Sequence, residues 1–216
     1  MKKASGVFIV ILFLLSSCKK NTQTTSDDLG YNYFPLKTGY VYTYQFDSIA
    51  FDDNTKSSDT FYFELTQIID TFYVNTSGEN VFLITQFVTD TTSKNTFQRP
   101  SFFVERNTRQ LIFTENNAPI VKLVFPVGNV RNWNGNMLNS NFRQTFNLSQ
   151  FNVSNGQHVI CRVQESNNIN AIEEDVAHTI YAQNIGIIEH YKRYLNKQAS
   201  GTSGYIVHLK LKDYTL

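Results

Sequence analysis

Apolar and polar residues alternate along several short segments of this chain. The clearest case is residues 40–46, where Tyr40, Tyr42, Tyr44 and Phe46 stand at every second position. Because successive side chains of a β-strand point to opposite faces, this spacing predicts a strand with one aromatic face. Residues 61–66 repeat the pattern, with Phe or Leu at the odd-numbered positions.

Further apolar or β-branched segments follow, separated by clusters of Asn, Asp, Ser, Thr and Gly. They lie at residues 81–88, 102–104, 110–114, 120–125, 158–163, 179–188 and 205–211. Many short strands with polar turns predict an antiparallel all-β domain of about ten strands, built as a curved sheet, an open barrel or a sandwich. Asn134-Gly135 and Asn155-Gly156 suit tight hairpin turns, since Asn and Gly accept positive φ at low cost.

At most one short helix is expected. Its best candidate is Asn170–His178, where Ile172 and Val176 stand four apart beside three acidic residues. The same residues also fit a polar loop that leads into the next strand.

The amino-terminal segment has the build of a secretory signal. Lys2 and Lys3 precede an apolar run over 7–15, which is too short to span a bilayer, and small residues follow it. Residues 19–30 contain one large apolar side chain and predict a flexible tether with a span of roughly 20 Å. The predicted organisation is a signal peptide at 1–17, a modified cysteine and tether at 18–30, and one β-rich domain at 31–216.

The sequence Leu15-Ser16-Ser17-Cys18 resembles the lipobox of bacterial lipoproteins. The resemblance implies that the Cys18 thiol receives diacylglycerol and that the signal is removed before it. At roughly 0.8 kcal/mol per buried methylene, two or three acyl chains would anchor the protein on a membrane. Lys19 stands where an Asp would resemble an inner-membrane retention signal, so the outer membrane is expected, on its periplasmic face or at the cell surface. The alternatives are a plain signal peptide with an incidental cysteine, or an uncleaved anchor.

Charge gives no reason to expect a nucleic-acid partner. Removing residues 1–17 takes two lysines from the 19 basic residues, which leaves 17 against 18 acidic residues, a net charge of −1. Of the two cysteines only Cys161 remains unmodified, so no intramolecular disulfide can form. Cys161 alternates with Val159 and Val163 and is expected in an apolar core.

Scattered motifs resemble those of uncharacterised lipoproteins of Bacteroidota. They are Tyr33-Phe34-Pro35-Leu36 with Gly39 following, Trp133-Asn134-Gly135-Asn136, and Ile185-Gly186-Ile187-Ile188. The resemblance implies a lipid-anchored β-rich domain and transfers no catalytic residue. Within the chain, Phe34-Pro35-Leu36 is partly repeated as Phe125-Pro126-Val127, either by chance or because the sheet has two related halves.

No motif indicates a cofactor, a metal site or a catalytic centre. The histidines, at 158, 178, 190 and 208, are not spaced as metal ligands, and nucleotide-binding and nucleophile motifs are absent. Acidic groups for a hydrolase could come from Asp52, Asp53, Glu173 or Glu174. Each stands in a polar run, however, which is typical of a solvated turn.

Aromatic residues are the candidates for ligand binding. Trp133, between Asn132 and Asn134, has a stacking face with amide groups beside it, which suits a sugar ring. The same ring could instead cover one end of the core, with its N–H bonded to the backbone. Tyr40, Tyr42 and Tyr44 are likewise candidates for a ligand platform or for the core.

Two short segments, Asp47-Ser48-Ile49 and Asp90-Thr91-Thr92, resemble the O-glycosylation sequon of exported Bacteroidota proteins. The resemblance implies glycan on Ser48 and Thr91, which would require exposed hydroxyl groups.

Three functions remain open from the sequence. The first is a lipid-anchored envelope module that binds an apolar or glycan ligand or an envelope partner. The second is a hydrolase of an envelope or extracellular polymer, and the third is a non-catalytic assembly subunit. An apolar cavity would favour the first, a groove lined by paired carboxylates the second, and a flat apolar patch the third.

Overall fold

The computed structural model describes residues 29–216, and in them the chain forms twelve β-strands and a single three-residue 3₁₀ helix. The signal segment, Cys18 and the tether up to residue 28 lie outside the described residues. The elements are η1 Tyr31–Tyr33, β1 Val41–Asp52, β2 Ser57–Val74, β3 Asn80–Asp90, β4 Thr96–Arg106, β5 Gln110–Glu115, β6 Ala118–Val124, β7 Asn132–Asn134, β8 Thr145–Asn155, β9 His158–Ile169, β10 Glu173–Ala182, β11 Gly186–Gln198 and β12 Gly201–Thr215.

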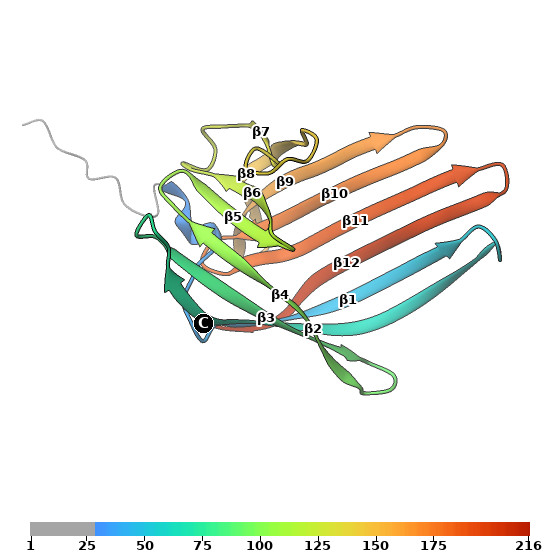
Figure 1. Ribbon diagram of the computed structural model, residues 1–216, viewed down its shortest axis with the longest axis horizontal. Helices are drawn as coiled ribbons and strands as arrows, with labels where there is room; N and C mark the ends of the chain where they lie inside the picture. Colours follow the sequence, from blue (N-terminus) through green and yellow to red (C-terminus); the bar gives the residue numbers. More distant parts are fainter. Residues whose placement is uncertain (1–28) are drawn as a thin grey trace, which may run out of the picture.

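All twelve strands belong to one sheet with the order β6-β5-β4-β3-β2-β1-β12-β11-β10-β9-β8-β7, in which neighbours run antiparallel. The chain therefore forms two meanders, β1–β6 and β7–β12, joined where β1 pairs with β12. Each copy of the Phe-Pro repeat precedes one meander. The sheet curls on itself into a nearly closed barrel (Figure 1). The expected antiparallel all-β class is confirmed, with a barrel instead of a sandwich.

The two ends of the sheet meet at a seam between β6 and β7. The backbone N–H of Val121 donates to the carbonyl of Gly135 at 2.8 Å, and the indole N–H of Trp133 donates to the carbonyl of Val121 at 2.8 Å. The side-chain amide of Asn139 donates to the carbonyl of Pro119 at 2.7 Å. These bonds satisfy backbone groups that an open sheet edge would leave unpaired.

The predicted alternation in β1 and β2 is confirmed. Tyr42 and Tyr44 are buried, and Tyr44 lies opposite the buried Leu65. Phe46 lies opposite Phe63, with ring centroids 5.6 Å apart. The inward faces of the strands thus form one aromatic-rich core inside the barrel, and all its buried members lie between residues 33 and 181.

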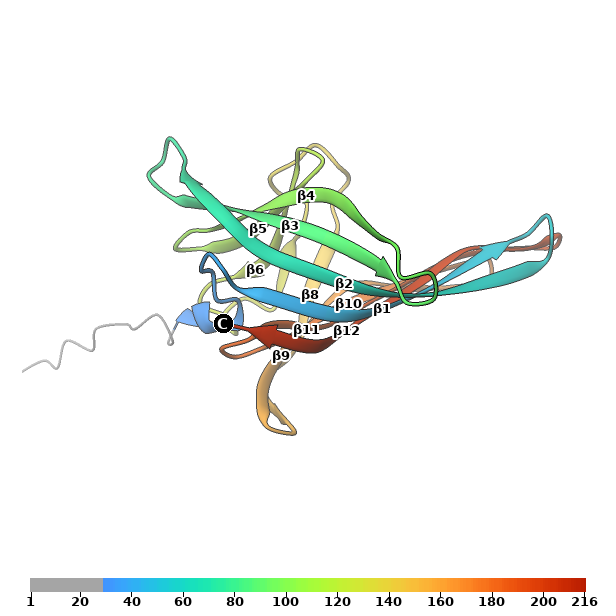
Figure 2. The same cartoon turned by 90° about the horizontal axis from the view of Figure 1, so that it is seen from below.

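Several hairpins extend beyond the barrel. Figure 2 shows β1, β2, β11 and β12 projecting together to one side. Phe61, on the inward face of β2, is 45% exposed because it lies on this extension. The inward face of this extension is mixed, since Ser48 and Lys192 share a cross-strand row with Phe61 and Val207.

Residues 170–178 do not form a helix. Glu173–Ala182 is strand β10, which pairs with β9 and β11, and the Asn170 side chain accepts bonds from the N–H groups of Ile172 and Glu173 to shape the preceding turn. The helical expectation is wrong because cross-strand pairing on both sides outweighs a short i, i+4 apolar pair. The expected segment 179–188 is likewise divided by a turn at 183–185 between β10 and β11.

The two Asn-Gly turns differ in outcome. Asn155 pairs with His158 around Gly156, which has φ of 61°, so the tight hairpin is confirmed there. Asn134-Gly135 instead begins a ten-residue loop over 135–144. The Asn134 side chain accepts bonds from the N–H groups of Asn136 and Gln144, so it holds the two ends of this loop together.

Leu29 and Gly30 already contact the barrel. Val127 N–H donates to the carbonyl of Leu29 at 3.0 Å, and Gly30 is buried. Among residues 29–216, no helix is long and apolar enough to cross a bilayer. The sheet, its seam and the core are complete within this segment.

Candidate functional site

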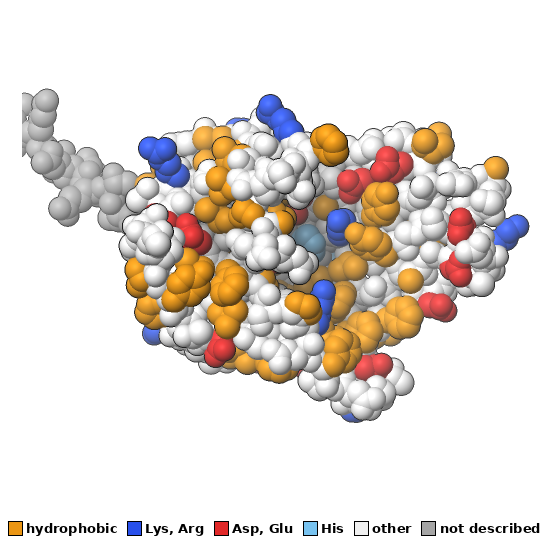
Figure 3. All heavy atoms as spheres, viewed as in Figure 1, with side chains coloured by type: hydrophobic (Ala, Val, Ile, Leu, Met, Phe, Trp, Pro, Cys, Tyr) orange, Lys and Arg blue, Asp and Glu red, His pale blue; other side chains and the backbone are white. Residues whose placement is uncertain are grey.

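A cavity of about 280 Å³ lies inside the barrel. Its walls come from β1–β6 on one side and β10–β12 on the other, and Phe34 contributes from the segment before β1. Figure 3 shows apolar side chains gathered around the hollow at the centre of one face. The volume lies just below the usual range of small-molecule sites, roughly 300–1,000 Å³.

One part of the cavity wall is apolar and aromatic. Phe113 packs between Phe34 and Phe102, with centroid distances of 5.2 and 5.4 Å, and Ile69 and Tyr42 complete this part. All five side chains are buried. An alkyl chain placed against them would be removed from water, which is favourable by about 25 cal/mol per Å².

Tyr181 adds an unpaired polar atom to this wall. The residue is fully buried and lines the cavity, yet its hydroxyl has no hydrogen-bond partner among the described residues. Burial is the main cause that raises the pKa of Tyr181 well above its ordinary value, so the group is a neutral hydroxyl. The hydroxyl oxygen itself has no exposed surface, so it lies behind the cavity wall and a ligand in the cavity does not reach it without movement of a neighbouring side chain.

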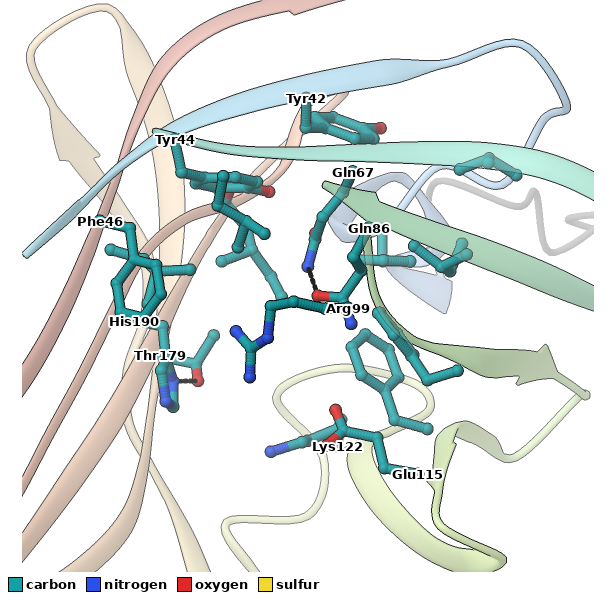
Figure 4. A pocket seen from close by; sticks show the side chains of 18 of the residues that line it. Tyr42, Tyr44, Phe46, Gln67, Gln86, Arg99, Glu115, Lys122, Thr179 and His190 are labelled. Atoms are coloured by element: carbon teal, nitrogen blue, oxygen red, sulfur yellow. Dashed lines mark hydrogen bonds between the residues drawn. The ribbon is translucent and has the colours of Figure 1, made fainter. Parts of the chain in front are cut away.

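Polar side chains line the rest of the cavity (Figure 4). The amide of Gln67 donates to Gln86 Oε1 at 3.1 Å, and the amide of Gln86 donates to the carbonyl of Pro100 at 2.9 Å. Arg99 stands opposite Gln86 in the β3–β4 register, and its guanidinium carbon lies 5.8 Å from the Phe46 ring centroid. The cavity is therefore amphipathic.

A buried ion pair stands beside this polar part. Lys122 Nζ lies 3.1 and 3.0 Å from the two oxygens of Glu165, and the Thr179 hydroxyl donates to Glu165 Oε1 at 2.7 Å. Burial by itself would raise the pKa of Glu165, but Lys122, His190 and Thr179 together hold that pKa down at about 2. Glu165 is thus a carboxylate that accepts three hydrogen bonds inside the barrel.

His190 completes this network as a neutral imidazole. Its burial is the main cause that lowers the pKa to about 4. His190 Nδ1 lies 2.9 Å from Thr179 Oγ1. Because the Thr179 hydrogen is already given to Glu165, we assign the Nδ1 proton to His190 as the donor, which leaves Nε2 as an acceptor.

The tyrosine candidates divide between two places. Tyr42 and Tyr44 line the cavity, and the Tyr44 hydroxyl donates to the carbonyl of Ile187 at 3.1 Å. Tyr40 precedes β1 and packs partly buried against the core, with Lys37 Nζ 5.7 Å from its ring centroid. Only the two residues within β1 are thus placed to contact a ligand in the barrel.

Trp133 belongs to the core and is not a ligand platform. Its side chain is 7% exposed, its N–H is bonded at the seam, and its ring meets Phe146 edge-on at 6.1 Å. The indole therefore offers no free face to a sugar.

The acidic candidates do not line the cavity. Asp52 accepts a bond from the Asn54 N–H at 2.9 Å and shapes the β1–β2 turn, where Asp53 also lies. Glu174 pairs with Arg193 at 2.9 Å and with Lys197. Glu173 starts β10, near the tip of the β9–β10 hairpin. Each group thus lies in a turn or at a strand end.

Other sequence candidates lie away from the cavity. Ser48 is half-buried on β1, whereas Thr91 is exposed and donates its hydroxyl hydrogen to the carbonyl of Tyr62 at 2.8 Å. His178 and His208 both approach Glu189 Oε1, at 3.2 and 3.6 Å. Within residues 29–216, no group of three or more His, Cys, Asp or Glu side chains is arranged to hold a metal ion.

Sequence reasoning missed the polar residues of the cavity. Gln67 and Gln86 occupy positions with the same parity as Leu65, Ile84 and Val88, so they face inward. A polar residue that interrupts an apolar alternation was the available signal. Arg99 and Lys122 gave no such signal, because β4 and β6 each contain a register shift that changes which residues face inward.

No known family model matches this chain. A search of curated proteins finds no match either. Among solved structures, the chain is similar to a protein from Bacteroides fragilis designated as exported, with a YmcC-like fold, and to one from Parabacteroides distasonis designated as a lipoprotein. Each shares 10% identity and covers 85% of this chain and 98% of its own, with a TM-score of 0.44.

Proposed function

We propose that this protein is a lipid-anchored module of the cell envelope that binds an amphipathic small molecule inside its barrel. The observation that carries the proposal is the cavity, which has a buried aromatic wall on one side and charged and amide side chains on the other.

Anchoring through Cys18 is the second part of the proposal and has its own test. Expression of the wild type and of Cys18→Ala in a bacterium that processes lipoproteins should give a product in the detergent phase for the wild type only. The variant should appear in the aqueous phase or unprocessed, because no acyl chain can be attached. Equal partition of the two proteins would contradict the anchor.

The hydrolase alternative has one feature to weigh. Thr179 and His190 are a hydroxyl and an imidazole at 2.9 Å, as a nucleophile and its base would be. Thr179 is, however, 2% exposed, and its hydroxyl hydrogen points to Glu165. A hydroxyl that donates to a carboxylate in this way cannot pass its proton to the imidazole, so the geometry favours binding over hydrolysis.

Ligand binding can be tested with a neutral amphiphile. We expect the protein comprising residues 29–216 to bind decan-1-ol, measured by isothermal titration calorimetry. Val207 lines the cavity, whereas its neighbour Ile206 points to the opposite face of β12. Val207→Trp should weaken binding by at least about tenfold through loss of apolar space, and Ile206→Trp should not. Absence of binding by the wild type, or equal binding by the two variants, would overturn the proposal.

A further inference from the structure

We infer that the ligand carries an anionic head group, a carboxylate or a phosphate monoester, and that Arg99 binds it at the edge of the cavity. The inference rests on the proposed function and names the chemical class of its ligand. It comes from the charges that face the cavity.

Four charged groups lie at or beside the polar part: Arg99, Glu115, Lys122 and Glu165. Lys122 and Glu165 neutralise each other at 3.0 Å. Arg99 has no carboxylate within 4.0 Å among residues 29–216, although Glu115 lines the same cavity. Arg99 is therefore a cation at a cavity wall without an acidic partner in the described part of the chain.

The Arg99 guanidinium is directed inward. Figure 4 shows it pointing across the cavity toward Thr179 and His190, with the Lys122 amine on the same side. Its position over the Phe46 ring is a cation–π contact, which leaves the in-plane N–H donors free. A guanidinium fork binds two oxygens of one carboxylate or phosphate. Lys122 has three donors and uses two on Glu165, so one remains for the same anion.

Glu115 explains why the opposite charge is less suited to the site. It is the last residue of β5, beside the exposed turn at Asn116 and Asn117, and it is exposed, as Arg99 is. A cationic head group beside Glu115 would meet the unpaired Arg99 in the same cavity, whereas Lys122 is already paired with Glu165. An anion beside Arg99 is repelled by Glu115 but attracted by the unpaired guanidinium, and its chain can reach the aromatic wall.

The test compares probes that differ only in the head group. Decanoate and decyl phosphate are titrated into residues 29–216 below their micelle-forming concentrations, with decan-1-ol as the neutral control. We expect at least one of the two anions to bind about tenfold or more tightly than the alcohol, since a charge-assisted bond is roughly twice as strong as a neutral one. The anion that binds more tightly identifies the head group as a carboxylate or a phosphate. This preference should shrink as salt concentration rises.

Two variants assign the preference to residues. Arg99→Gln should remove this preference, because it should lower the affinity for the preferred anion at least about fivefold more than the affinity for decan-1-ol. Glu115→Gln should strengthen binding of the preferred anion severalfold by removing a repulsive charge. Equal affinity of the wild type for both anions and the alcohol, or an equal loss for all probes in Arg99→Gln, would overturn the inference and leave the proposed function standing. If no probe binds to the wild type, the proposed function itself fails. The salt series needs no variant, so the inference stays testable even if Arg99→Gln does not fold.

Discussion

The buried pair of Lys122 and Glu165 gives the sharpest prediction for stability. Replacing Lys122 by Met keeps a long unbranched side chain but removes the ammonium group. Glu165 would then keep only the Thr179 hydroxyl as a donor within the pair's surroundings. The side chains of the pair are 16% and 8% exposed, so water cannot replace the lost partner.

Removing one partner of a buried ion pair costs about 3–5 kcal/mol. The lowered pKa of Glu165 agrees in direction, because Lys122 is the group that stabilises its charged form most. We therefore expect Lys122→Met to lower the free energy of unfolding at pH 7 by about 3 kcal/mol.

The loss should depend on pH with a definite sign. In the wild type the pKa of Glu165 is depressed, so its contribution to stability is present above pH 4.5 and is lost as the pH falls toward 2. In Lys122→Met, burial without a cation raises that pKa, so acid neutralises the carboxylate and relieves the cost. The difference in unfolding free energy between the two proteins should therefore become smaller as the pH falls from 7 to 5. Lys122 also lowers the pKa of His190, so that pKa should be higher in Lys122→Met. This change also reduces the stability difference between the two proteins as the pH falls.

The assay is urea unfolding followed through Trp133, the single tryptophan, which is buried in the folded barrel. The control is the double variant Lys122→Met/Glu165→Gln, which has no unpaired charge and should recover much of the lost stability. A loss below about 1 kcal/mol at pH 7, or a stability difference between the two proteins that stays constant from pH 7 to pH 5, would contradict this prediction.

Three further predictions concern the seam, the extension and the surface. Trp133→Phe should destabilise the protein by about 1–3 kcal/mol, because it leaves a buried carbonyl without its donor. The measurement is urea unfolding followed by circular dichroism. The control is Phe142→Ala, at a side chain that is 97% exposed, which should change stability by less than about 0.5 kcal/mol. Phe63→Ala should cost less than the roughly 3–5 kcal/mol typical of a fully buried ring, since Phe63 is half-buried, and a cost in that full range would contradict this placement. Glycan at Ser48 or Thr91 should appear in the intact mass of the protein from its native host, and an unmodified mass would remove that prediction.

The class of fold could be predicted from the amino-acid sequence, because strand alternation is a local property. The alternation within each strand predicts one apolar face without reference to the rest of the chain, as at Tyr42, Tyr44, Phe63 and Leu65. The turn at Asn155 was readable for the same reason, since a two-residue hairpin needs only its own residues. Cys161 in the core followed from the same alternation, and it is fully buried.

Contacts between distant segments determine the structure where local sequence signals conflict or are absent. Residues 173–178 carry a weak helical pattern, but pairing with strands on both sides makes them β10. The choice of a barrel over a sandwich depends on the seam, where Trp133 bonds a carbonyl twelve residues away. A single sequence contains no sign of that distant partner.

The candidate site was decided by the barrel alone. Arg99, Lys122, Glu165, Thr179 and His190 come from five strands and are spaced irregularly along the chain, so no motif links them. Register shifts in β4 and β6 change the inward-facing parity there, which defeats prediction from alternation. Closure of the sheet brings these charges beside an aromatic wall, and that juxtaposition, which is a property of the folded chain, gives the cavity its amphipathic chemistry.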